Sequence, residues 1–184
     1  MSKLPDKAKK VFNGVIFDVY QWEQEMYDGS TETFEMLGRE PACDILAISE
    51  GKKILLSHQS QPNKEDFYSL FGGRIEEQEE PLIGAKRELL EESGYESDEW
   101  ELLRIYQPVH KIDWSNYFYI ARNCKKTSDQ KLDSGEKIEI IECDFDEFIR
   151  IVKSEKYSGK ELVLDIYRME EAGELEEFKR KMLS

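Results

Sequence analysis

The sequence is poor in cysteine, and it lacks the apolar segments that direct a chain to or through a membrane. Its three cysteines, Cys43, Cys124 and Cys143, are far apart and form no Cys-x-x-Cys pair. We therefore expect reduced thiols in a cytoplasmic protein, and neither a disulfide framework nor a zinc site. The charged residues at the start are followed by no apolar segment, which predicts no signal peptide. No run reaches the roughly 18 apolar residues of a membrane span, so we expect no membrane partner.

Positive charge is also scarce. The 184 residues include 26 Lys and Arg against 40 Asp and Glu, which gives a net charge of −14. A nucleic-acid surface needs clustered cations that neutralise phosphates, so we do not expect nucleic acid as a partner. A small phosphate-bearing substrate is compatible with this charge, because a bound divalent cation reverses the local field.

Aromatic residues are plentiful, with nine Phe and nine Tyr in a chain that is 39% hydrophobic. This composition is typical of a packed core, and the length suits one globular domain with an appended subdomain. Short β-branched and aromatic runs predict many strands, near residues 15–27, 31–37, 43–49, 53–57, 66–71, 101–106, 116–121 and 138–142. Helices are predicted at residues 81–93, 145–155, 160–169 and 175–182, and 127–136 is a long polar loop. This order indicates a mixed α/β (α+β) sandwich.

The predicted helix at 81–93 carries an unusual concentration of negative charge. Pro81 suits its first turn and Gly94 the position just after its end. Glu88, Glu91 and Glu92 are three and four residues apart, so they lie on one side of the helix, where like charges repel. A solvated acidic face would permit this clustering. A hard divalent cation would explain it, because Mg²⁺ binds carboxylates together with substrate phosphates.

The same stretch resembles the Nudix box. The matching pattern is Gly73, five residues, Glu79, seven residues, and then Arg87-Glu88-Leu89-Leu90-Glu91-Glu92-Ser93-Gly94. Tyr95 departs from it, because an aliphatic residue is usual there. The resemblance implies a Nudix-type α/β/α sandwich with a mixed β-sheet over residues 41–184, preceded by an antiparallel β-stranded extension over residues 1–40.

The resemblance also implies an activity and a set of ligands. The expected reaction is hydrolysis of a nucleoside diphosphate linked to another group, with Mg²⁺ or Mn²⁺. By position, Glu88, Glu91 and Glu92 would be catalytic metal ligands, and the carbonyl of Gly72 would join them. The structural residues of the motif would be Gly73, Glu79, Arg87 and Gly94, with Glu79 and Arg87 forming a pair.

Beyond the box, the chain is most similar to the ADP-ribose (ADP-sugar) pyrophosphatase branch. Residues 59–62 resemble its Gln-x-Arg-Pro segment, with Gln61 in place of the arginine. Residues 132–138 resemble its acidic loop, which makes Glu136 a further catalytic metal ligand. Ser134 stands where many members carry the Glu taken as general base, so the base is left open between Asp133, Glu139 and a Glu of the box.

The residues expected to contact a small nucleotide substrate are Trp22, Gln61, Arg74 and His110. His110 stands where a Pro usually marks ADP-ribose specificity, so the nucleotide sugar is not fixed. The extension exchanges between subunits in this branch, which implies a homodimer. Two alternatives stay open: another Nudix substrate such as a nucleoside triphosphate or NADH, and a nucleotide sensor that no longer hydrolyses.

Overall fold

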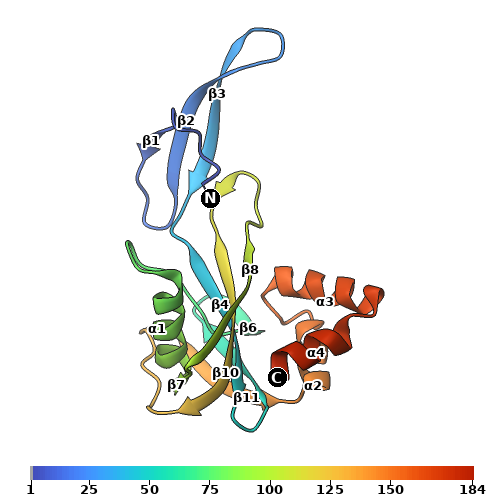
Figure 1. Ribbon diagram of the computed structural model, residues 1–184. Helices are drawn as coiled ribbons and strands as arrows, with labels where there is room; N and C mark the ends of the chain where they lie inside the picture. Colours follow the sequence, from blue (N-terminus) through green and yellow to red (C-terminus); the bar gives the residue numbers. More distant parts are fainter. Residues whose placement is uncertain (1) are drawn as a thin grey trace.

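The N-terminal strands form a sheet of their own that projects from the rest of the molecule (Figure 1). The structure is a computed structural model that describes residues 2–184. The strands of this first sheet lie in the order β1-β2-β3-β9, and all pairs are antiparallel except β3 with β9. Their bounds are β1 Lys9–Phe12, β2 Asp18–Glu25, β3 Thr31–Gly38 and β9 Ile112–Asp113. Because β9 comes from the later part of the chain, it ties this sheet to the second one.

The second sheet is mixed and carries the core. Its strands lie in the order β11-β5-β4-β10-β7, with β6 paired to β5 and β8 paired to β10. The pair of β4 and β10 is parallel, and the other pairs are antiparallel. The bounds are β4 Ala42–Ser49, β5 Ile54–Gln61, β6 Lys64–Ser69, β7 Tyr95–Glu96, β8 Glu99–Tyr106, β10 Asn116–Lys126 and β11 Lys137–Cys143.

Helices cover both faces of this second sheet, because its central strands are apolar on both sides. Along β4, Ile45 and Ala47 pack toward Leu89 of α1. Leu46 and Ile48 point the other way and pack against the C-terminal helices. The helix bounds are α1 Pro81–Ser93, α2 Phe145–Val152, α3 Lys160–Ala172 and α4 Leu175–Leu183. The expected α/β/α arrangement is therefore confirmed (Figure 1).

The ends of α1 and the start of α2 agree with their sequence signals. Pro81 is the first helical residue of α1, and Gly94 ends the helix in the left-handed conformation with φ 73°. Its N–H donates to the carbonyl of Leu90 at 2.8 Å. Before α2, the carboxylate of Asp144 accepts from the backbone N–H of Glu147 at 2.9 Å, which is the predicted cap.

Several predicted boundaries need correction. The strand predicted from residue 15 begins at Asp18, and the helix predicted to residue 155 ends at Val152. The short strands β1, β7 and β9 were not predicted at all. The loop expected at 127–136 is present, and the three cysteines are free and buried.

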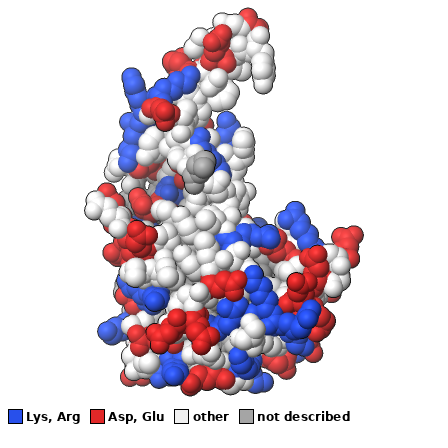
Figure 2. Space-filling view, in the orientation of Figure 1, with Lys and Arg blue, Asp and Glu red and all other residues white. Residues whose placement is uncertain are grey.

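The face shown in Figure 2 carries interspersed acidic and basic side chains over the helical part of the molecule. No continuous basic surface is visible on this face. Among residues 2–184, no helix combines the length and the apolar character that crossing a bilayer requires.

Candidate functional site

The acidic side of α1 faces a cleft of about 560 Å³. The helical spacing places Glu88, Glu91 and Glu92 on the side that lines this cleft. The loop at 127–136, which is distant from α1 in the sequence, contributes Asp133 and Glu136 to the same cleft. A hydrogen bond connects this loop to α1: the Lys131 N–H donates to the Glu91 carbonyl at 2.8 Å. Two distant segments thus bring five carboxylates to one cleft.

Glu92 is the most buried of these carboxylates, with 6% of its surface exposed. Its Oε2 accepts one hydrogen bond, from the backbone N–H of Gly72 at 2.8 Å. The pKa of Glu92 is raised from 4.5 to about 8, chiefly by burial and to a smaller extent by the charges of Glu88 and Glu136, while the hydrogen bond from Gly72 acts in the opposite direction. The pKa of Glu88 is also raised, chiefly by burial. Removing these carboxylates from water is unfavourable unless a cation compensates them.

The two glycines before α1 allow the backbone to approach these carboxylates. Gly72 has φ 144°, and a Cβ there would collide with the backbone carbonyl of Cys43. At Gly73, a Cβ would lie 2.7 Å from the carboxyl atoms of Glu88. The carbonyls of Phe71 and Gly73 accept hydrogen bonds from β4, whereas that of Gly72 accepts none from residues 2–184. The Gly72 carbonyl is therefore free to bind another group.

Arg87 is held by a fork-shaped pairing with Glu79. Its Nε and Nη2 donate to the two carboxylate oxygens of Glu79, each at 3.1 Å. Nη2 also donates to the carbonyl of Arg74 at 3.0 Å, which fixes the loop before the helix. The remaining nitrogen, Nη1, donates to Glu88 at 2.8 Å and to Glu91 at 3.0 Å. The structure thus brings the expected pair together and links it to two of the acidic residues.

The donors in this cleft fit a divalent metal ion of the magnesium type. They are carboxylate oxygens and one free carbonyl, which hard cations prefer. Glu92 is buried and Glu88 is partly buried, and a cation would offset the cost of removing these carboxylates from water. In residues 2–184, however, no three such side chains converge on one point. The Nη1 of Arg87 lies between Glu88 and Glu91 instead. Glu91, at 42% exposure, has the freedom to turn from Arg87 toward an ion.

The four residues expected to contact the substrate do not all lie in the cleft. Arg74 lines the cleft. Gln61 lines an adjoining hollow of about 320 Å³ that shares Glu136 with the cleft. Trp22 is 9% exposed and packs on Phe34 in the N-terminal sheet. His110 is exposed and is not part of the cleft. The contacts predicted for Trp22 and His110 therefore find no support within a single chain.

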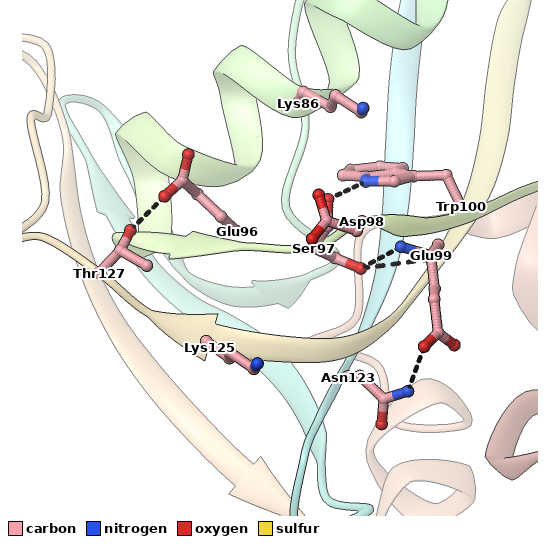
Figure 3. A pocket seen from close by; sticks show the side chains of 9 residues that line it. All are labelled: Lys86, Glu96, Ser97, Asp98, Glu99, Trp100, Asn123, Lys125 and Thr127. Carbon is pink, nitrogen blue, oxygen red and sulfur yellow. Dashed lines mark hydrogen bonds between the residues drawn. The ribbon is translucent and has the colours of Figure 1, made fainter.

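Another hollow, of about 370 Å³, lies beside α1, β7 and β8 (Figure 3). Its polar side chains mostly bond to one another: Asn123 donates to Glu99 at 2.7 Å, and Thr127 donates to Glu96 at 2.6 Å. The indole of Trp100 donates to the carbonyl of Ser97 at 2.8 Å. This hollow contains none of the expected site residues and few polar groups that need a ligand, so we assign the site to the acidic cleft.

Comparisons with known proteins identify the family of the chain. The family model described as NUDIX domain matches residues 38–164. The chain belongs to the Nudix family. It is a Nudix hydrolase, a pyrophosphohydrolase, and members of this family typically use a divalent metal ion and act on small nucleotides.

Two relatives and one solved structure extend the comparison. The chain is 28% identical over 161 residues to the "Methanol dehydrogenase activator" of Bacillus methanolicus, covering 85% of this chain and 87% of that protein. It is 26% identical over 167 residues to the "ADP-ribose pyrophosphatase" of Bacillus subtilis (strain 168), covering 87% and 90%. A crystal structure of an "ADP compounds hydrolase" superposes with a TM-score of 0.70 at 16% identity, covering 94% of this chain and 100% of that one.

Sequence reasoning missed one residue of the cleft that the structure makes prominent. Arg39, which follows β3, lines the cleft together with Arg74. Val15 and Ile16, from the connection between β1 and β2, also lie at its rim. The sequence gives little signal for Arg39, because it is a single cation between a strand and Pro41 and its neighbours come from distant segments.

Proposed function

We propose that this Nudix hydrolase cleaves the pyrophosphate bond of a nucleoside diphosphate linked to another group, with ADP-ribose or another nucleotide sugar as the substrate. The observation that carries the proposal is the gathering of Glu88, Glu91, Glu92 and Glu136 in one cleft, with Glu92 buried. The relative named ADP-ribose pyrophosphatase supports the choice of substrate class.

The proposed metal ion is Mg²⁺, with Mn²⁺ as a substitute. The groups that would hold it are Glu88, Glu91, Glu92, Glu136 and the free carbonyl of Gly72. When bound, the ion neutralises the diphosphate, orients it and lowers the pKa of an attacking water. The clamp of Arg87 on Glu79 keeps the helix and the preceding loop in register, so that the carboxylates stay directed at the cleft.

The candidates for the general base differ in whether they line the cleft. Asp133 lines the cleft, whereas Glu139 lies on β11, 3.5 Å from His58, and is not part of the cleft. We therefore propose that Asp133 or a Glu of the box takes the proton from the attacking water. Ser134, at the position resembling that of the base, has no carboxylate with which to do so.

A hydrolysis assay with matched charge variants tests the proposal. In Glu92→Gln, the cleft loses one buried carboxyl group, and we expect turnover of ADP-ribose with Mg²⁺ to fall by at least a hundredfold. Glu171→Gln makes the same change on the exposed part of α3 and should leave turnover unchanged. Full activity in Glu92→Gln would refute the assigned role.

The substrate class is tested separately with a panel containing ADP-ribose, other nucleotide sugars, NADH and nucleoside triphosphates. A preference for triphosphates or NADH would keep the reaction but replace the substrate. Nucleotide binding without hydrolysis of any of them would favour the sensor. The intact pattern from Gly73 to Gly94 is the reason that we favour hydrolysis.

We further propose that two chains pair through the N-terminal sheet. The sheet is small, and it leaves Val11 and Phe12 of β1 54% and 61% exposed, with Tyr27 also fully exposed. An exposed strand edge with apolar side chains favours pairing with another chain. Sedimentation equilibrium should give twice the chain mass of 21.7 kDa, and Phe12→Glu should give the single mass. A monomeric wild-type chain at micromolar concentration would refute the dimer.

A further inference from the structure

The side-chain amide of Gln130 joins three segments of the chain. Its Nε2 donates to the backbone carbonyl of Glu92 in α1 at 2.6 Å and to that of Ile138 in β11 at 3.1 Å. Gln130 itself lies in the loop at 127–136, and β11 is an edge strand of the second sheet. One amide group thus closes the base of the loop and attaches it to the residue of α1 that carries the buried carboxylate.

The residues next to Gln130 are also held by α1. The Lys131 N–H donates to the carbonyl of Glu91 at 2.8 Å, and the side chain of Leu132 packs against the core cluster that contains Leu89. The last four carbonyls of a helix have no partner within that helix. The loop supplies donors to two of them, those of Glu91 and Glu92. The loop is therefore ordered by the helix as far as Leu132.

The turn that follows Leu132 depends on this base. The Glu136 N–H donates to the carbonyl of Asp133 at 3.0 Å, which closes a turn over residues 133–136. Both residues line the cleft, yet within residues 2–184 their carboxylates form no hydrogen bond and no ion pair. The direction of the two carboxylates is therefore set by the backbone on either side of the turn. Gln130 connects these two sides.

Few side chains could take the place of this amide. Both of its partners are carbonyl oxygens, so the group between them must donate two hydrogen bonds. A Lys ammonium can also do this: the Nζ of Lys3 donates to the carbonyls of Val109 and Ile112 at 2.7 and 3.0 Å. A Glu carboxylate has the shape of the amide, but it would place an acceptor oxygen against each carbonyl and repel both.

We propose that Gln130 is a positioning residue of the cleft: its amide holds the turn at 133–136 against α1, so that Asp133 and Glu136 face the carboxylates of the helix. The inference rests on the proposed function. Gln130 is not among the described residues that line the cleft. It therefore acts through the turn and not by touching a metal ion or the substrate.

NMR relaxation of the metal-free protein in EDTA tests the attachment of the turn. In the wild type, we expect the amide order parameters of residues 133–136 to be near the value of a rigid backbone, about 0.85. Gln130→Met keeps the length of the side chain and removes both donors, so these values should fall below about 0.6, as in a flexible loop. The order parameters of α1 should not change.

Three variants control this measurement. Gln130→Glu should behave like Gln130→Met, and Gln130→Lys should keep the turn ordered because it can still donate to both carbonyls. Asp129→Met introduces the same side chain at the exposed neighbouring residue and should leave the turn as it is in the wild type. With ADP-ribose and Mg²⁺, kcat should fall about tenfold in Gln130→Met, as expected for the loss of two hydrogen bonds, and recover in Gln130→Lys.

Titration with Mn²⁺ separates positioning from a general contribution to stability. Gln130→Met should weaken Mn²⁺ binding about tenfold, because Glu136 is no longer held toward the ion. The comparison is the double variant Asp133→Asn, Glu136→Gln, whose turn has no carboxylate left. There, adding Gln130→Met should change the affinity less than about twofold, since changes that act through the same groups are not additive. A residue that only stabilised the fold would have the same effect in both backgrounds.

The outcomes distinguish this inference from the proposed function. A turn that stays ordered in Gln130→Met, or unchanged Mn²⁺ affinity and turnover in that variant, overturns the positioning role while hydrolysis by the wild type stands. Equal weakening of Mn²⁺ binding in both backgrounds shows that Gln130 does not act through the turn, and also overturns it. If the wild type hydrolyses no nucleotide of the panel but the order parameters and the Mn²⁺ affinities change as expected, the positioning role stands and the proposed function falls.

Discussion

Replacing Glu92 by Gln should stabilise the metal-free protein at alkaline pH while it removes activity. The carboxylate is 6% exposed, and burial raises its pKa from 4.5 to about 8. Between these two values the folded state holds a proton that the unfolded state releases. The free energy of unfolding of the wild type therefore falls as pH rises through this window. The amide of Gln carries no charge, so the variant escapes this loss.

The size of the effect follows from the same two values. Each pH unit within the window changes the free energy of unfolding by about 1.4 kcal/mol. From pH 5.5 to pH 8, this group should cost the wild type roughly 3 kcal/mol that it does not cost Glu92→Gln. Urea unfolding in EDTA at several pH values measures the difference, with Glu171→Gln as the control.

Added Mg²⁺ should make the wild type the more stable of the two proteins at alkaline pH, because a bound cation replaces the proton as the partner of the Glu92 carboxylate. We expect the melting temperature of the wild type at pH 8 to rise with Mg²⁺, and that of Glu92→Gln to rise much less. A difference in stability between the two proteins that does not vary with pH would refute the reasoning, because Glu92 would then not be a desolvated carboxylate.

Two other predictions concern the frame around the carboxylates. Arg87→Met breaks the fork with Glu79 and should lower the free energy of unfolding by about 2–3 kcal/mol, less than for a fully buried pair because Arg87 is 27% exposed. Urea unfolding checks this, with Lys86→Met as the exposed control, and a loss no larger than in that control contradicts it. Gly73→Ala places a methyl group against the carboxylate of Glu88 and should lower kcat at least tenfold with a melting temperature within a few degrees of wild type. Unaltered kcat would show that the close approach does not matter.

Local signals made α1 and the central strands predictable. The helix begins at Pro81 and ends before Gly94 because each residue type suits that backbone conformation. The strands β4, β5 and β10 of the second sheet contain apolar runs. In contrast, β7 and β9 are two residues long and exist because of their partners. The strand β1 begins with Lys9 and is formed by pairing with β2.

Some residues of the candidate site could likewise be predicted from local sequence, and others could not. The carboxylates of α1 could be predicted because a short motif contains all of them at helical spacing. Arg39 could not, because its surroundings are built from Phe17 and Trp114, which only folding brings to it. For Trp22, the sequence shows only an aromatic residue in a strand. Its packing on Phe34 depends on the tertiary structure and could not be predicted from the sequence.

The central claim is that the acidic cleft of this Nudix hydrolase holds a divalent cation through Glu92 and its neighbours. Titration with Mn²⁺, followed by the electron paramagnetic resonance signal of the free ion, measures this directly. We predict that the wild type binds Mn²⁺ and that Glu92→Gln binds it at least tenfold more weakly, with Glu171→Gln unchanged. Equal binding by all three proteins, or no binding by the wild type, would contradict the claim.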